Sequence, residues 1–149
     1  MTIYNHKLTD KIINSGTRYP DLFHKMPADV SCYLDHFNLP YNDAFYEGGY
    51  VKIGENNIFL QTFSPQDYSK TAFLFHGYFD HSGYFGNVIS LLVKLNIRVV
   101  LWDQPGYGLS EGARGFCNSF EEYVAVAEAI IEKFEETSNT TNFLIGHSA

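Results

Sequence analysis

From residue 71 onward, apolar runs of strand length alternate along the chain with amphipathic helical segments. Residues 71–75 form an apolar run that is typical of a strand covered on both faces, as parallel sheets require. Further strands are predicted at 97–102 and 142–145, and a helical pattern lies between each strand and the next. This order is that of an open sheet with right-handed crossovers, so the sequence predicts an α/β fold.

Two more strands are expected before this region. Residues 50–53 and 58–62 have strand-like composition, and the stretch 54–57 between them begins with glycine, which favours a hairpin. Upstream, prolines in first helical turns favour short helices around 20–25 and 28–37. We therefore expect a helical extension at 1–46 and a partial α/β domain at 47–149.

The two crossover helices carry their own signals. Ser82 is expected to cap the first, and Ser119 with Glu122 forms a capping box at the start of the second. The side chains expected to face the sheet are Phe85, Val88, Ile89, Leu92 and Leu95 in the first helix and Phe120, Val124, Ala127, Ile131 and Phe134 in the second.

Composition narrows the classes of function. Hydrophobic residues make up 45% of the 149 residues and charged residues 18%, which excludes a disordered chain. The net charge of −7 disfavours a nucleic-acid-binding surface and attraction to anionic lipids. The cysteines, Cys32 and Cys117, lack metal-pair spacing, the first ten residues hold no signal-peptide pattern, and no segment has the length of a transmembrane helix. These features predict a cytoplasmic protein with reduced thiols.

Chemistry in such a sheet is expected just beyond the carboxyl ends of the strands. Three loops emerge there, at 76–78, 103–112 and 146–149. The last, Gly-His-Ser-Ala, has the pattern of a nucleophile elbow, G-x-S-x-G, without the final glycine. In an elbow, small residues flank the serine so that other backbone can approach closely, and Gly146 and Ala149 are suitably small.

These loops resemble those of the α/β-hydrolase superfamily, in its monoacylglycerol lipase, lysophospholipase and serine aminopeptidase-like branch. The run His-Gly-Tyr-Phe-Asp-His-Ser-Gly-Tyr-Phe at 76–85 is similar to the branch motif H-G-x-x-[DE]-H-S-G-R-Y, with Tyr84 in place of arginine and Phe85 in place of tyrosine. The segment 103–112 is similar to the D-x-x-G-x-G-x-S-x-G loop of the same branch. The resemblance covers residues 45–149 and implies the amino-terminal half of a hydrolase sheet: a hairpin and three parallel strands with two crossover helices.

The resemblance also implies roles for individual residues. Ser148 would be the nucleophile of a carboxylic-ester hydrolase, and the amides of Tyr78 and Ala149 would stabilise the oxyanion. His147 is interpreted as part of the elbow packing rather than as the general base. Asp103 is expected to tether its own loop. The remaining supporting residues are His76, Gly77 and Gly146.

The family's triad runs in the order Ser, Asp or Glu, His. No residue after Ala149 supplies the acid or the histidine, so we expect this chain alone to be inactive and β-strand 142–145 to have an open edge. The substrate implied by the resemblance is a small acyl ester, with no cofactor. A complementing carboxyl-terminal half, or self-association through the open edge, is the expected form of partnership.

Two alternatives stay open. One is a non-catalytic fragment or half of a split hydrolase. The other is a metal-dependent hydrolase, because His76, Asp80 and His81 have part of the spacing of a zinc site, although Tyr78 stands where a second histidine is needed. Nucleotide binding is disfavoured, because the glycine spacing at 106–112 is not that of a phosphate loop.

Overall fold

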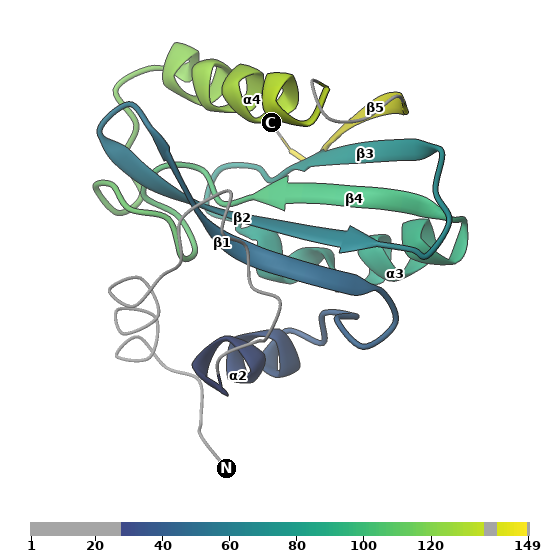
Figure 1. Ribbon diagram of the computed structural model, residues 1–149. Coiled ribbons are helices and arrows are strands. Elements are labelled where there is room, and N and C mark those ends of the chain that lie inside the picture. Colours follow the sequence, from purple (N-terminus) through teal and green to yellow (C-terminus); the bar gives the residue numbers. More distant parts are fainter. Residues whose placement is uncertain (1–27, 136–139, 149) are drawn as a thin grey trace.

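The computed structural model describes residues 28–135 and 140–148 and consists of one mixed sheet with helices on both faces (Figure 1). The strand order is β1-β2-β4-β3-β5. The pairs β1/β2 and β2/β4 are antiparallel, whereas β4/β3 and β3/β5 are parallel. The strands are β1 (Phe45–Ile53), β2 (Asn56–Ser64), β3 (Lys70–Phe75), β4 (Ile97–Trp102) and β5 (Thr141–Gly146).

Alternation along the strands builds two cores, one on each face. In β4, Val99 and Leu101 join the core beneath α2 and α3, whereas Val100 and Trp102 join the core beneath α4. Successive side chains of a strand point to opposite faces, so the continuous apolar run at 99–102 serves both cores. The helices are α2 (Ala28–His36), the 3₁₀ turn η1 (Ser82–Phe85), α3 (Gly86–Lys94) and α4 (Phe120–Glu135).

The predicted α/β architecture is confirmed. The hairpin turns at Gly54, whose φ of +56° suits glycine, and its two strands are longer than the sequence pattern indicated. Strand β1 already begins at Phe45. The expected helix at 28–37 is α2, and the one at 20–25 lies outside the described residues. Within 28–135 and 140–148, no helix combines the length and apolarity required to cross a bilayer.

The predicted face of the first crossover helix is partly wrong. Ile89 is buried as expected, but Val88 and Leu95 are exposed, and Val93 is buried instead. The helix begins with a 3₁₀ turn, whose three-residue period shifts the phase of the stripe. The N-cap of that turn is also not Ser82 but His81, whose side chain accepts a hydrogen bond from the Gly83 amide.

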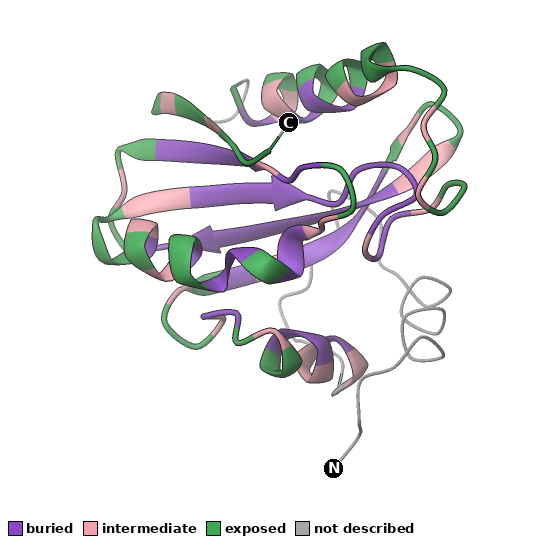
Figure 2. Cartoon of the chain, turned by 180° about the vertical axis from the view of Figure 1, so that it is seen from behind, coloured by how far each residue is buried: buried purple, intermediate pink, exposed green. Residues whose placement is uncertain are grey.

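The predicted face of α4 is partly wrong as well. Val126 and Ile130 point into the core with Ala127 and Phe134, whereas Phe120 and Val124 are exposed. Glu122 of the predicted capping box accepts its hydrogen bond from the Asn118 amide, at 3.3 Å, and Asn118 is the residue before Ser119. The helix α4 lies near the edge of the sheet that is formed by β5. The residues of β5 are themselves largely exposed (Figure 2).

Candidate functional site

Strands β3 and β5 end side by side and bring two of the three loops together. Phe75 pairs with Gly146 at the last position of the parallel ladder, and the His147 amide donates a hydrogen bond to the Phe75 carbonyl at 3.0 Å. The loop at 76–78 and the segment 146–148 therefore leave the sheet next to each other, as the sequence predicted from the parallel order.

Gly77 is the point of closest approach between these two loops. A Cβ atom at this position would lie 2.6 Å from the carbonyl oxygens of both His147 and Ser148. No real Cβ atom tolerates that separation, so glycine is required where the backbone of His147 and Ser148 passes. At Gly146, by contrast, no heavy atom of the described residues lies within 4 Å of such a Cβ, so the close approach expected at Gly146 occurs at Gly77.

Ser148 has a left-handed backbone conformation, with a φ of +53°. Positive φ is uncommon outside glycine, and a strained turn directly after a strand is the geometry of a nucleophile elbow. Such a turn projects the serine hydroxyl beyond the sheet. Ala149, the second expected oxyanion donor, lies outside the described residues.

His76 holds the loop after β3 through both of its ring nitrogens. It is buried, its Nδ1–H donates to the Gly77 carbonyl at 2.9 Å, and its Nε2 accepts from the Gln104 amide at 2.8 Å. These two bonds fix the tautomer and use both ring nitrogens. His76 therefore ties the loop after β3 to the loop after β4.

Asp103 is a fully buried carboxylate that organises two loops. Oδ1 accepts from the Ser82 amide at 2.7 Å, and Oδ2 accepts from the Leu109 amide at 2.8 Å. Gly108 is pressed against the carboxylate, because a Cβ there would lie 2.1 Å from Oδ2. Ser110 completes the loop by donating to the Asp103 carbonyl at 2.6 Å. Both carboxylate oxygens of Asp103 therefore bind backbone amides of the two loops.

A buried polar network supports the Ser82 side of this arrangement, and the sequence did not reveal it. The Gln61 side-chain amide donates to the Ser82 hydroxyl at 2.8 Å, and Tyr46 donates to the Gln61 carbonyl oxygen at 3.1 Å. Tyr33 of α2 lies 3.3 Å from His81 Nδ1. The only sequence signal was a glutamine inside the apolar run of β2. Through Tyr33, α2 becomes part of the support of the site.

Asp80 joins the loop after β3 to the segment after β5. Its Oδ1 accepts from the His81 amide at 2.8 Å, and its Oδ2 lies 3.4 Å from His147 Nδ1.

Burial lowers the pKa of His81, against the smaller opposing effects of the Asp103 and Asp80 charges. The His81 ring is thus held neutral among the rings of Phe37 and Tyr84.

A cavity of about 460 Å³ opens beside Ser148. Its walls come from the loop at 75–78, from Gln104, from α4 and from Leu144 of β5. Apolar side chains dominate these walls, and Glu128 is the charged residue among them. The exposed α4 stripe forms one wall, so we call this hollow the apolar trough; its α4 residues are Phe120, Tyr123, Val124, Ala127, Glu128 and Ile131.

A general base for Ser148 is not found in the described part of the chain, where no hydrogen bond joins its hydroxyl to a histidine. The metal-site alternative also loses support, because the nitrogens of His76 and Nδ1 of His81 are engaged in protein hydrogen bonds. Residues 28–135 and 140–148 contain no cluster of three metal-ligating side chains.

Comparison with known proteins agrees with this geometry. Residues 66–149 match the family described as Serine aminopeptidase, S33. The chain belongs to this serine aminopeptidase family of α/β-hydrolases. The chain is 35% identical to the phospholipase YtpA of Bacillus subtilis over half of its length, and 27% identical to human monoglyceride lipase over 83% of its length.

Solved structures support the same family. A monoacylglycerol lipase from Paleococcus ferrophilus is 35% identical, with a TM-score of 0.53 over 61% of this chain. The matched regions are 29% of the phospholipase, 40% of human monoglyceride lipase and 33% of the Paleococcus lipase. This member of the serine aminopeptidase family therefore spans less than half the length of each of these three relatives.

Proposed function

We propose that this chain carries the nucleophile and part of the oxyanion hole of a serine hydrolase that cleaves carboxylic esters. The observation that supports this most directly is the left-handed turn at Ser148, held against Gly77 at the carboxyl ends of β3 and β5. The oxyanion donors would be the amides of Tyr78 and Ala149, as the resemblance implies.

The reaction would proceed in two steps. The Ser148 oxygen bonds to the ester carbonyl carbon while its proton passes to a general base, and the alcohol leaves with a proton returned by that base. Water then attacks the acyl-serine ester, which releases the carboxylic acid and restores the hydroxyl. Acylglycerols or lysophospholipids are the substrate class we favour, because a monoglyceride lipase and a phospholipase are among the relatives.

The acid and the histidine of the triad are proposed to come from polypeptide beyond these residues, so that the chain alone is inactive. Two surfaces support this. The outer edge of β5 carries no neighbouring strand among the described residues, and the apolar trough leaves Val124 and Leu144 exposed to water. A further segment that covered both would bury apolar surface next to Ser148.

A chimera tests this function. Residues 1–149 are fused to the carboxyl-terminal part of the phospholipase YtpA, and the protein is assayed with p-nitrophenyl butyrate and a fluorophosphonate probe. We expect hydrolysis and labelling by the chimera and by its Ser90→Ala control, but not by Ser148→Ala. A chimera that folds by circular dichroism and remains unreactive would contradict the proposal. Labelling of the unfused chain would contradict its inactivity.

A second candidate is a non-catalytic chain that pairs through β5. Leu144 is 65% exposed on this edge strand, which holds no charge or proline to block pairing. Sedimentation of the purified chain would then show concentration-dependent oligomers that Leu144→Lys abolishes. Monomers at all concentrations would exclude self-association.

A further inference from the structure

The loop after β3 displays an aromatic side chain where the backbone favours glycine or asparagine. Gly77 to Asp80 form a tight turn, closed by a hydrogen bond of 3.2 Å from the Asp80 amide to the Gly77 carbonyl. Phe79, at the third position, has a φ of +62°. Turns with positive φ at this position take glycine or asparagine, because a bulky side chain is strained there.

Neither folding nor solubility accounts for this phenylalanine. Its side chain is 81% exposed, so it contributes little to the core. Among the described residues, four other than glycine have positive φ: two are asparagines, Asn38 and Asn96, one is Ser148 in the elbow, and the fourth is Phe79. Strain of this kind is retained where a surface has a function.

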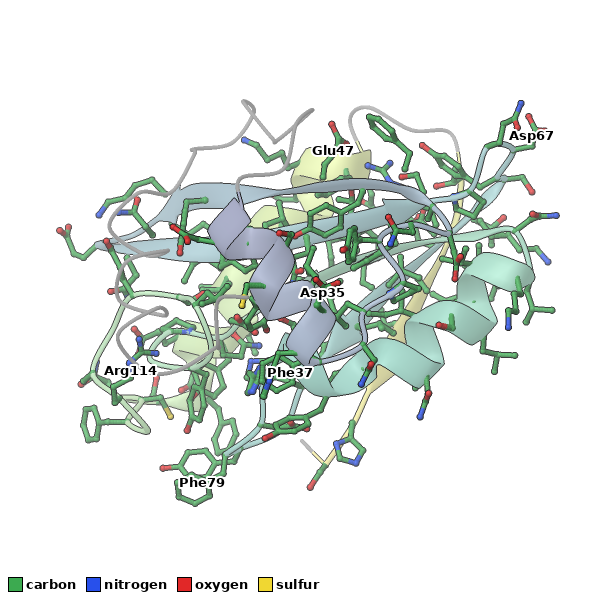
Figure 3. The ribbon with its side chains drawn as sticks, turned by 90° about the horizontal axis from the view of Figure 1, so that it is seen from below. Asp35, Phe37, Glu47, Asp67, Phe79 and Arg114 are labelled. Carbon is green, nitrogen blue, oxygen red and sulfur yellow. The ribbon has the colours of Figure 1, made fainter. Side chains whose placement is uncertain are left out.

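Phe79 belongs to a group of exposed rings, Tyr78, Phe79 and Phe116, which we call the aromatic tip. The Tyr78 and Phe79 rings are 4.4 Å apart, and the Tyr78 hydroxyl donates to the Gly115 carbonyl at 3.0 Å. Phe116, the next residue, is also exposed. Figure 3 shows Phe79 at the outer margin of the molecule with its ring directed outward. These contacts join Tyr78 and Phe79 to the loop that carries Phe116.

The charges around the tip differ from those of the whole chain. Although the net charge is −7, the segments 77–79 and 113–120 contain no carboxylate and a single cation, Arg114. The acids nearest in sequence are Asp80, whose oxygens contact the His81 amide and His147, Glu111, which accepts from the Asn57 amide, and Glu121 and Glu122 in the first turn of α4. Projecting uncharged rings are suited to the boundary between headgroups and acyl chains, where aromatic side chains are stable.

We propose that the aromatic tip inserts into a neutral or zwitterionic lipid surface and places the mouth of the site against it. Tyr78 belongs both to the tip and to the wall of the cavity that contains Ser148, so a lipid ester at that surface would lie next to the serine. The biological purpose rests on the proposed ester hydrolysis, but insertion itself does not need the serine. The net negative charge excludes anionic lipid as the preferred surface.

Binding to vesicles tests the insertion. The full chain is sedimented with dioleoylphosphatidylcholine vesicles, and Phe79→Asn is compared with Phe45→Thr. Phe45 is a matched control, because it is 57% exposed at the start of β1, at the opposite end of the sheet. We expect Phe79→Asn to weaken vesicle binding about tenfold, because one ring that is partly buried in the lipid is lost. Phe45→Thr should leave vesicle binding unchanged. Equal loss in both variants, or no binding by the wild type, would overturn the proposal.

A fluorescent variant locates the ring. The single natural tryptophan, Trp102, is buried, so Phe79→Trp adds one exposed indole. Its emission should shift to shorter wavelength on vesicles and be quenched by brominated acyl chains. Binding only to phosphatidylglycerol vesicles, or self-association without lipid that Phe79→Asn removes, would overturn the insertion. Ser148→Ala should bind vesicles like the wild type, because insertion does not use the serine. Vesicle binding therefore tests the insertion separately from the proposed hydrolysis.

Discussion

The α-carbon of Gly77 faces the carbonyl oxygen of Ser148 so closely that a methyl group at Gly77 would lie 2.6 Å from it. This contact joins the loop after β3 to the turn after β5 through backbone alone. It depends on the parallel pairing of the two strands up to Phe75 and Gly146. The strand pairing therefore brings the backbone of Ser148 against Gly77, and the contact of Asp80 with His147 joins the same two loops through side chains.

Replacement of Gly77 tests this contact. Gly77→Ala should destabilise the chain by about 2 kcal/mol, because the methyl group must displace backbone. Gly146→Ala is the matched control, since it has open space around it and should change stability by less than about 0.5 kcal/mol. Urea unfolding followed by circular dichroism measures both. Similar stabilities for the two variants would show that the backbone of His147 and Ser148 does not press on Gly77.

The Asp103 carboxylate gives a second prediction. In Asp103→Asn, one side-chain position becomes an NH₂ group that faces a backbone N–H of Ser82 or Leu109 and cannot accept its bond. Loss of a buried charge-assisted hydrogen bond should cost about 2–3 kcal/mol. Asp67→Asn, at an exposed position, should be neutral. Chemical denaturation of both variants provides the measurement, and a neutral Asp103→Asn would refute the tethering role.

Much of this arrangement was predictable because the strands are apolar on both faces. The run at 71–75 could only be an interior strand, and the parallel order then placed the three loops at one edge of the sheet. The contact at Gly77 could not be predicted, because it depends on how far the backbone after β5 turns. The sequence instead indicated Gly146, the glycine of the motif, which has open space around it.

The predicted buried faces of α3 and α4 are partly wrong for local structural reasons. The 3₁₀ turn before α3 changes the helical phase, and no sequence signal distinguishes it from a first α-turn. On α4, Phe120 and Val124 follow the helical period but line the apolar trough instead of the core. Long-range hydrogen bonds were equally invisible, because Tyr33 and Ser82 are far apart in sequence and meet only after α2 packs on the sheet.

Protonation of His81 predicts a pH dependence of stability. Burial lowers its folded-state pKa below the ordinary value of 6.5, so the unfolded chain takes up a proton first as the pH falls. Stability should therefore be fully retained above pH 6.5 and decrease below it, until the folded state also binds the proton. Thermal melts between pH 7.5 and 5 should show this decrease. His81→Asn keeps an acceptor for the Gly83 amide and should make the loss of stability at low pH smaller. His36→Asn should leave that loss unchanged. If the melting temperature of His81→Asn changed with pH as it does in the wild type, the pH dependence would come from other titratable groups.

Strain at Phe79 predicts that a polar replacement stabilises the fold. Asparagine tolerates the left-handed region, so Phe79→Asn should raise the free energy of unfolding by about 1 kcal/mol, although it removes an aromatic ring. The reciprocal change, Asn96→Phe, places phenylalanine at an exposed position with a φ of +55°. This change should lower the free energy of unfolding by about the same amount. Urea unfolding of the two variants measures both changes. If Phe79→Asn proved less stable than the wild type, the ring would have a structural role, and its exposure would no longer point to a binding surface.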